Sequence, residues 1–302
     1  MFPIIPANSV TAAGGNDEGI FGFGSPTTAI TNLVSDAGVV ASDTAGVGTA
    51  RANLAACEYG GDKGIFGFGE PGPTGVTNLV SNTGVVASDT AAVGTARHSL
   101  AACSYGDDKG IFGFGVNSSG SKVSITNLVS NAGVVASDTA GVGLARSSPA
   151  ACEYGGDKGI FGFGLYVSTP WLTTAVTNKV SNAGVVASDT AGVGTARANI
   201  SACSYGEDKG IFGFGDPGVP TNLTNLVSNV GVVASDATPV GTGRTSPAAT
   251  QYGGDKAIFG FGTNSSWVAT AITNLVSNAG VVASDQAATT GTARRGLGAC
   301  SF

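Results

Sequence analysis

The sequence predicts an all-β fold, a six-bladed β-propeller of four-stranded blades that the C-terminal strand closes by pairing into the first blade. Three observations support this: one unit occurs six times, each unit contains short strand-like segments without a helical period, and the chain ends complete each other. Copies of Ile-Phe-Gly-Phe-Gly are spaced by 45, 46, 49, 51 and 47 residues, beginning at Ile20, Ile65, Ile111, Ile160, Ile211 and Ile258. A period of about 40–50 residues with four strands is typical of propeller blades.

Each unit contains four short segments that we expect to be strands. In one copy they are, in order, Leu54–Tyr59, Ile65–Gly69, Thr77–Ser81 and Gly84–Asp89. Gly60-Gly61-Asp62-Lys63 joins the first two as a hairpin turn, because glycines supply the positive φ that such turns need. Strict alternation in Ile65–Gly69 predicts both phenylalanines on one face, with Ile65, Gly67 and Gly69 on the other. A neighbouring sheet can approach the glycine face closely.

The two ends of the chain predict a closed ring. The first copy enters at Asn16 without the small-residue strand that precedes every later copy, and the chain finishes with that strand, Gly296–Phe302. An open solenoid needs capping repeats with polar outer faces, which are absent. We therefore expect a propeller over residues 16–302 and an extended N-terminal arm over residues 1–15.

An arginine precedes each small-residue strand, and a glycine-ended apolar strand follows it. This order resembles kelch-type propeller repeats, which implies that Ala55-Ala56-Cys57 lies nearest the axis. The kelch double glycine is a single glycine here, and the kelch tryptophan of the third strand is absent. The near-verbatim Gly-Phe-Gly, Thr-Asn-Leu-Val-Ser and Ala-Ser-Asp-Thr segments are also similar to repeat proteins among the structural (tail or capsid fibre) proteins of tailed bacteriophages.

Composition excludes several classes of protein. A net charge of −6 with fourteen thinly spread basic residues argues against nucleic-acid binding. No apolar run approaches the roughly 18–20 residues that span a bilayer, so no membrane insertion is expected. The N-terminus shows no basic region followed by a long apolar core, so a secretory signal is not evident.

The repeated polar residues favour structural roles over catalysis. Each Ser-Asp aspartate and the arginine after it occur in all six copies, whereas an active site needs one asymmetric constellation, so we expect turn capping or Asp–Arg pairing. Five cysteines share one repeat position and are expected to be buried, small and free: Cys57, Cys103, Cys152, Cys203 and Cys300. No C-x-x-C or histidine cluster indicates a metal site, and the calcium pattern of RTX repeats is not matched.

Nothing in the sequence indicates an enzyme or a cofactor. Gly64-x-x-Gly67-x-Gly69 superficially suggests a phosphate loop, but no helix and no Lys-Ser/Thr pair follows it. The only histidine, His98, replaces small or polar residues of other copies, which favours a surface or loop position. No nucleophile elbow is present. We expect neither catalytic residues nor bound metal.

The candidate binding residues lie in the segments that differ between copies. These segments, between Gly-Phe-Gly and Thr-Asn, are expected on one face of the disc, and they contain Tyr166, Trp171 and Trp267. Exposed aromatic residues on diversified loops are typical of binding surfaces. The alternative is that the tryptophans cover the ends of neighbouring blades.

Two functions are weighed. The first is a non-enzymatic virion protein of a tailed phage, a tail-fibre or capsid-decoration propeller whose variable loops recognise a host-surface glycan or protein. Its apolar arm, with Phe2, Pro3, Ile4 and Ile5, would dock onto other virion proteins, although a frayed end is the alternative. The second is a cellular or secreted kelch-type propeller, extracellular or cytoplasmic, that binds proteins or glycans.

Overall fold

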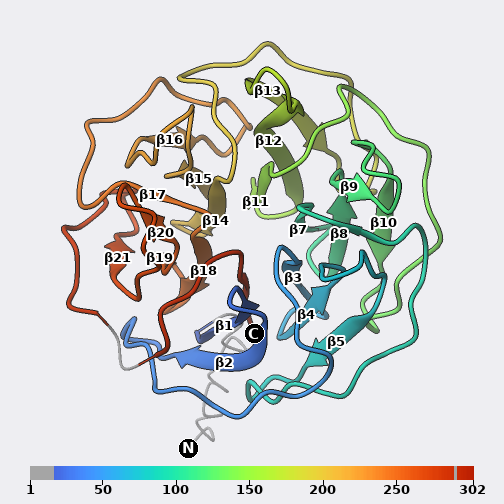
Figure 1. Ribbon diagram of the computed structural model, residues 1–302, viewed down its shortest axis with the longest axis horizontal. Helices are drawn as coiled ribbons and strands as arrows, with labels where there is room; N and C mark the ends of the chain where they lie inside the picture. Colours follow the sequence, from blue (N-terminus) through green and yellow to red (C-terminus); the bar gives the residue numbers. More distant parts are fainter. Residues whose placement is uncertain (1–16, 289–290) are drawn as a thin grey trace, which may run out of the picture.

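The computed structural model describes residues 17–288 and 291–302, which form six three-stranded antiparallel sheets around a common centre (Figure 1). From the inner to the outer strand, the sheets are β22 (Gly298–Ser301), β1 (Gly19–Gly24) and β2 (Thr28–Val34); β3 (Ala55–Tyr59), β4 (Lys63–Gly67) and β5 (Thr77–Val80); β7 (Ala101–Tyr105), β8 (Lys109–Gly113) and β10 (Thr126–Val129); β11 (Ala150–Tyr154), β12 (Lys158–Val167) and β13 (Leu172–Val180); β14 (Ser201–Tyr205), β15 (Lys209–Gly213) and β16 (Thr224–Val227); β18 (Ala248–Tyr252), β19 (Lys256–Gly260) and β21 (Thr273–Val276).

Two small two-stranded sheets complete the architecture. One pairs β6 (Arg97–His98) with β9 (Val116–Asn117), and the other pairs β17 (Arg244–Thr245) with β20 (Thr263–Asn264). Within the described ranges, no helix has the length and apolar character to cross a membrane.

The C-terminal strand pairs into the first sheet, as the chain ends predict. β22 lies antiparallel to β1, with Gly19 opposite Ser301 and Gly22 opposite Gly298. Phe302 extends this pairing by donating its backbone N–H to the carbonyl of Glu18 at 3.1 Å. The six inner strands contact one another in a closed cycle, and their small residues allow this convergence at the axis.

A ring of backbone hydrogen bonds encircles the axis just before the inner strands begin. Each member donates its N–H to the carbonyl of the member before it, at 2.7–3.2 Å, and Asn53 closes the ring by donating to Gly296. All members have φ between 51° and 61°, the left-handed region that turns the chain into the inner strand. The members of this axial ring are Asn53, Ser99, Ser148, Asn199, Ser246 and Gly296.

Neighbouring sheets pack through phenylalanine and glycine. Phe66 of β4 packs edge-on against Phe23 of the preceding sheet, with ring centroids 5.1 Å apart. A Cβ on Gly22 would lie 2.7 Å from the Phe66 ring, so only glycine allows this approach. Equivalent aromatic pairs recur between all adjacent sheets, and each interface holds one buried apolar cluster.

The prediction that both phenylalanines of Ile65–Gly69 share a face is wrong. Phe66 belongs to the cluster shared with the preceding sheet, whereas Ile65 and Phe68 belong to the cluster shared with the following sheet. Phe68 has φ 66°, and this left-handed residue breaks the alternation and turns its ring to the Ile65 side. One unit therefore supplies an aromatic ring to each of its two interfaces.

The expected fourth strand, Gly84–Asp89 in this copy, is not a continuous strand. It pairs with β5 at the isolated bridge Val80↔Val86, and the next residue of the chain, Thr90, forms a second isolated bridge with Thr77. Between them, the Asn78 amide donates to the Ala87 carbonyl at 3.0 Å and to Asp89 at 2.9 Å. The register shifts by one residue around this side chain, so the regular ladder of each sheet ends after three strands.

The repeated arginines are buried between sheets. Arg51 is 1% exposed, donates to Asn78 Oδ1 at 2.6 Å and to the Phe68 carbonyl at 2.7 Å. Its guanidinium lies 4.3 Å from the ring centroid of Phe23 in the preceding sheet. Burial lowers the pKa of Arg51 to about 10, against the opposing effect of Asp89, so it remains charged at neutral pH. The stacking on phenylalanine and the bond to asparagine recur at Arg97, Arg146, Arg197, Arg244 and Arg294, whereas Nε of Arg146 and Nε of Arg244 have no hydrogen-bond partner among the described residues.

The repeated aspartates tie neighbouring units together. Asp89 accepts hydrogen bonds from the backbone N–H and the hydroxyl of Thr49, and it lies 3.9 Å from Arg51. The predicted structural role of these aspartates is confirmed: all six accept hydrogen bonds from the neighbouring copy, and Asp43, Asp89, Asp138 and Asp236 also lie within 4.0 Å of an arginine. The predicted burial of the five cysteines is also confirmed, and all five are free thiols. Each Cys faces a position that is glycine or, beside Cys203, Ala257.

Candidate ligand-binding site

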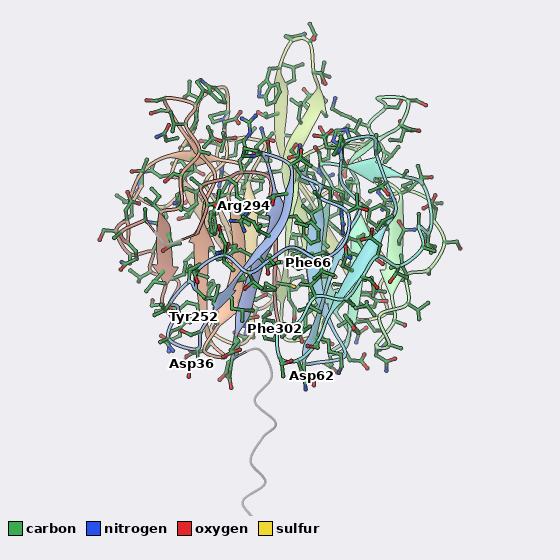
Figure 2. All side chains as sticks on the ribbon, turned by 60° about the horizontal axis from the view of Figure 1, so that its bottom comes forward. Asp36, Asp62, Phe66, Tyr252, Arg294 and Phe302 are labelled. Carbon is green, nitrogen blue, oxygen red and sulfur yellow. The ribbon has the colours of Figure 1, made fainter. Side chains whose placement is uncertain are left out.

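All six variable segments begin at the same end of the disc, which we call the loop face. The first residue of each segment pairs with the residue after the repeat arginine, as in Ala52↔Glu70 and Ala198↔Asp216. The longest projection from this face is the β12–β13 hairpin, which rises above the disc in Figure 2. The turns that contain Asp62 lie at the opposite end. The prediction of a single variable face is therefore confirmed.

Trp171 and Trp267, predicted as binding residues, line the same cavity on the loop face. The tryptophan cavity has a volume of about 450 Å³ and is lined by residues of the fourth, fifth and sixth copies and by Arg295, which pairs with Ser25 of the first. Trp171 is at the tip of the β12–β13 hairpin and is 44% exposed; Trp267 is 61% exposed. With this exposure, neither indole is a buried cover for the end of a blade. The remaining lining residues are Asn199, Asp216, Pro217, Gly218, Thr245, Ser246 and Arg295.

The geometry at Trp267 is strained. It has φ 59°, and its N–H closes a turn onto the Asn264 carbonyl at 2.9 Å. Gly120 occupies the equivalent position of an equivalent turn, with φ 75° and an N–H bond to the Asn117 carbonyl. A bulky side chain in this conformation costs roughly 1–3 kcal/mol, whereas glycine adopts it freely. The turn itself therefore does not require tryptophan.

Asp216 supplies a buried carboxylate to the tryptophan cavity. It is only 4% exposed, and its Oδ2 accepts hydrogen bonds from Asn199 Nδ2 at 3.1 Å and from the Thr245 hydroxyl. Its Oδ1 has no hydrogen-bond partner among the described residues, and the residue lines the cavity. A ligand donor can therefore bind Oδ1 without displacing either existing bond.

Arg295 is the cation of the cavity. Its backbone pairs with Ser25 at 2.7 and 3.1 Å, which fixes the base of an exposed side chain. Its guanidinium has no ion-pair partner in the part of the chain that the structure describes. The adjacent Arg294 is fully buried, so two consecutive arginines have different environments.

Sequence reasoning placed Tyr166 in this site, but the structure does not. Tyr166 is 36% exposed on β12 and does not line the tryptophan cavity. Asp216 and Arg295 were missed. One signal was available for Asp216: Arg-Ala-Asn and Phe-Gly-acid-Pro-Gly occur together only in the copies of Glu70 and Asp216.

The predicted docking arm, Phe2, Pro3, Ile4 and Ile5, lies outside the described residues. His98 lies on the loop face in β6, where its Nδ1 is 3.0 Å from Ser99 Oγ and 3.6 Å from Glu70 Oε2. Both contacts fall on the same ring nitrogen, so these three residues do not form a serine–histidine–acid relay, which uses both nitrogens. Within the described ranges, no group of three His, Cys, Asp or Glu is arranged to hold a metal ion.

No protein-family model and no curated protein matches the chain. Among solved structures, the chain is similar to the one titled "Structure of YjhT", with a TM-score of 0.64 and 12% sequence identity. The match covers 88% of this chain and 94% of that chain. At this identity the likeness shows the fold alone, which is a kelch-like β-propeller. None of these comparisons supports the expected origin in a tailed-phage virion.

Proposed function

We propose that the chain is a six-bladed kelch-like β-propeller that binds a saccharide in the tryptophan cavity and catalyses no reaction. The observation that supports this most directly is the convergence of Trp171 and Trp267 on one cavity beside the open carboxylate oxygen of Asp216. Cavities of this size, with aromatic walls and few oriented polar groups, are typical of small-ligand sites.

The chemistry of the lining favours a sugar over a proline-rich peptide. Both ligands present apolar faces that stack on indole rings. A proline residue, however, has no N–H to donate, and burying Asp216 Oδ1 under such a peptide would leave a carboxylate oxygen unpaired. A sugar hydroxyl donates to that oxygen while the C–H face of the same ring packs on tryptophan.

The strain at Trp267 supports a role beyond folding. A mostly exposed tryptophan in the left-handed conformation destabilises the free protein, because a bulky residue with this φ is strained. The third copy avoids the strain, because its equivalent residue is glycine. Retaining such a residue is understandable if the indole contacts a ligand.

The lining offers little for hydrolysis. Glycosidases use two carboxylates that flank the bond they cleave. Asp216 is the one carboxylate that lines the tryptophan cavity among the described residues, and its two present hydrogen bonds hold its position as an acceptor. The arrangement suits a hydrogen-bond acceptor for a ligand hydroxyl.

The experiment is a glycan-array and calorimetric comparison of the wild type with Trp171→Ala and Asp216→Asn. We expect wild-type binding and a loss of about 30-fold or more in Trp171→Ala, the usual size of a central aromatic contact. Tyr166→Ala, an exposed aromatic outside the cavity, is the matched control and should bind normally. If no saccharide binds, or if both cavity variants bind like the wild type, the proposal fails.

A virion location remains a second candidate, supported by the near-verbatim repeats that resemble phage structural proteins. In that setting the loop face would contact a host-surface glycan, and Phe2–Ile5 would dock onto other virion proteins. Mass spectrometry of purified particles from a phage that encodes this chain tests it. Absence of its peptides from intact particles would leave the cellular or secreted alternative.

A further inference from the structure

We infer that the ligand is an oligosaccharide chain, which extends from the tryptophan cavity across the axis into a second subsite at Glu70. This inference rests on the proposed saccharide binding and adds the ligand's length and its second contact. It follows from a second cavity on the loop face, from a repeated acid–asparagine pair, and from residues that line both cavities.

The second cavity, which we call the Glu70 cavity, has a volume of about 490 Å³. Its lining is mostly hydroxyl, amide and charged side chains, without any tryptophan. It suits a ligand rich in hydroxyl groups rather than an apolar one. The lining residues are Ser25, Thr27, Ala52, Asn53, Glu70, Pro71, Gly72, Ser99, Asn199, Ser246 and Arg295.

Glu70 and Asp216 occupy equivalent positions and have equivalent partners. Asn53 Nδ2 donates to Glu70 Oε1 at 2.6 Å, as Asn199 Nδ2 donates to Asp216 Oδ2 at 3.1 Å. Each acid also contacts the residue after the arginine of the next copy. Glu70 Oε2 lies 3.6 Å from His98, and Asp216 accepts a hydrogen bond from Thr245. The asparagine holds each carboxylate at the edge of its cavity. These two copies are the second and the fifth, so the pairs lie on opposite sides of a six-fold ring.

The two cavities meet over the axis. Asn199, Ser246 and Arg295 line both of them, so the two cavities are direct neighbours on the loop face. Four axial-ring members line the Glu70 cavity, and they are fixed by the ring's backbone hydrogen bonds. A chain lying across this floor meets amide and hydroxyl groups at fixed positions, and Arg295 at the junction.

A single sugar can fill one cavity only, so chain length is the quantity to vary. Calorimetry measures the binding of four ligand series to the wild type, each from the monomer to the hexamer. Three series are β-1,4-linked, of glucose, N-acetylglucosamine or mannose, and the fourth is α-1,4-linked glucose. We expect affinity to rise at least tenfold between the monomer and the longer members of the series that binds. Glu70→Gln keeps the shape and removes the charge, so it should weaken the hexamer about tenfold and leave the monomer unchanged.

The controls separate the two proposals. Glu207→Gln changes an exposed carboxylate in a turn at the opposite end and should bind like the wild type. Trp171→Ala should weaken every member of the series. Equal affinity for monomer and hexamer, or unchanged length dependence in Glu70→Gln, would overturn the second subsite while leaving saccharide binding intact. Failure of every series, or binding of a polyproline peptide instead, would overturn both.

Discussion

Asn53 donates its backbone N–H to the carbonyl of Gly296 at 2.8 Å, which ties the start of the C-terminal strand to the sheet of β3. Gly296 in turn donates to Ser246 at 3.0 Å, so the axial ring has no open end. β22 and β1 close the same ring at the level of the sheets. Closure therefore depends on the last seven residues, Gly296–Phe302.

Deleting Gly296–Phe302 should promote aggregation. The truncation exposes the backbone edge of β1 and uncovers Ile20 and Phe66, which Cys300 and Phe302 help to bury. Unpaired edge strands recruit other chains. We expect aggregation or higher oligomers in size-exclusion chromatography and a lower melting temperature. A truncated protein that stays monomeric with unchanged melting would contradict the role of this strand in closure.

Glycine positions in the middle strands should differ in their tolerance of alanine. A Cβ on Gly113 would lie 2.8 Å from Cζ of Phe161, a buried ring already packed against Phe114. Gly113→Ala should destabilise the protein by about 3 kcal/mol, as overpacking does. A Cβ on Gly110 would instead meet the thiol of Cys57 at 2.5 Å.

That thiol can rotate, because the last copy already has alanine at the equivalent Ala257, where it faces Cys203. Gly110→Ala should therefore cost only about 1 kcal/mol, at the low end of what overpacking costs. Urea unfolding of both variants provides the comparison. Equal losses in the two would refute this distinction.

The repeat allowed much of the fold to be predicted, because six copies share one pattern and each strand boundary is seen six times. Residues with unusual φ were beyond this reasoning. Alternation placed Phe66 and Phe68 on one face, and the left-handed Phe68 reverses that. The prediction of a fourth strand also failed. The sequence of this segment is strand-like, but the Asn78 side chain occupies part of its hydrogen-bonding edge.

The candidate site was predicted only in part, for a geometrical reason. Trp171 and Trp267 stood out as the two tryptophans of the chain, and both line the cavity. Tyr166 is five residues from Trp171 on the same hairpin, but only Trp171, at the hairpin tip, lines the cavity. Asp216 and Arg295 come from other copies, and their proximity depends on the curvature of the ring, which no local pattern encodes.

Replacing Trp267 by glycine should raise stability and abolish binding together. Glycine removes the left-handed strain, as Gly120 does in its own turn, which should stabilise the fold by about 1 kcal/mol. The same change removes one aromatic wall of the tryptophan cavity. Thermal melting and glycan binding measured on one preparation test both effects. A variant that melts lower than the wild type would mean that this indole stabilises the fold by packing, which is the opposite of our prediction.

Glu153 should make the protein less stable as the pH rises. It lies on β11 near the axis, where burial, together with Glu58, raises its pKa from 4.5 to about 8. Between these values the folded protein holds a proton that the unfolded chain has released, so the free energy of unfolding falls with increasing pH across that window. Glu153→Gln has no carboxyl group at this position, so its free energy of unfolding does not fall for this reason as the pH rises.

We expect the Glu153→Gln variant to match the wild type near pH 4 and to exceed its stability at pH 8. The gain is on the order of a few kcal/mol, since the carboxylate must otherwise ionise beside Glu58 in a largely buried site. Glu207→Gln, an exposed control, should leave the pH profile unchanged. Denaturant unfolding at a series of pH values measures the effect. Parallel profiles for the wild type and Glu153→Gln would show that this carboxylate ionises in the folded state without cost.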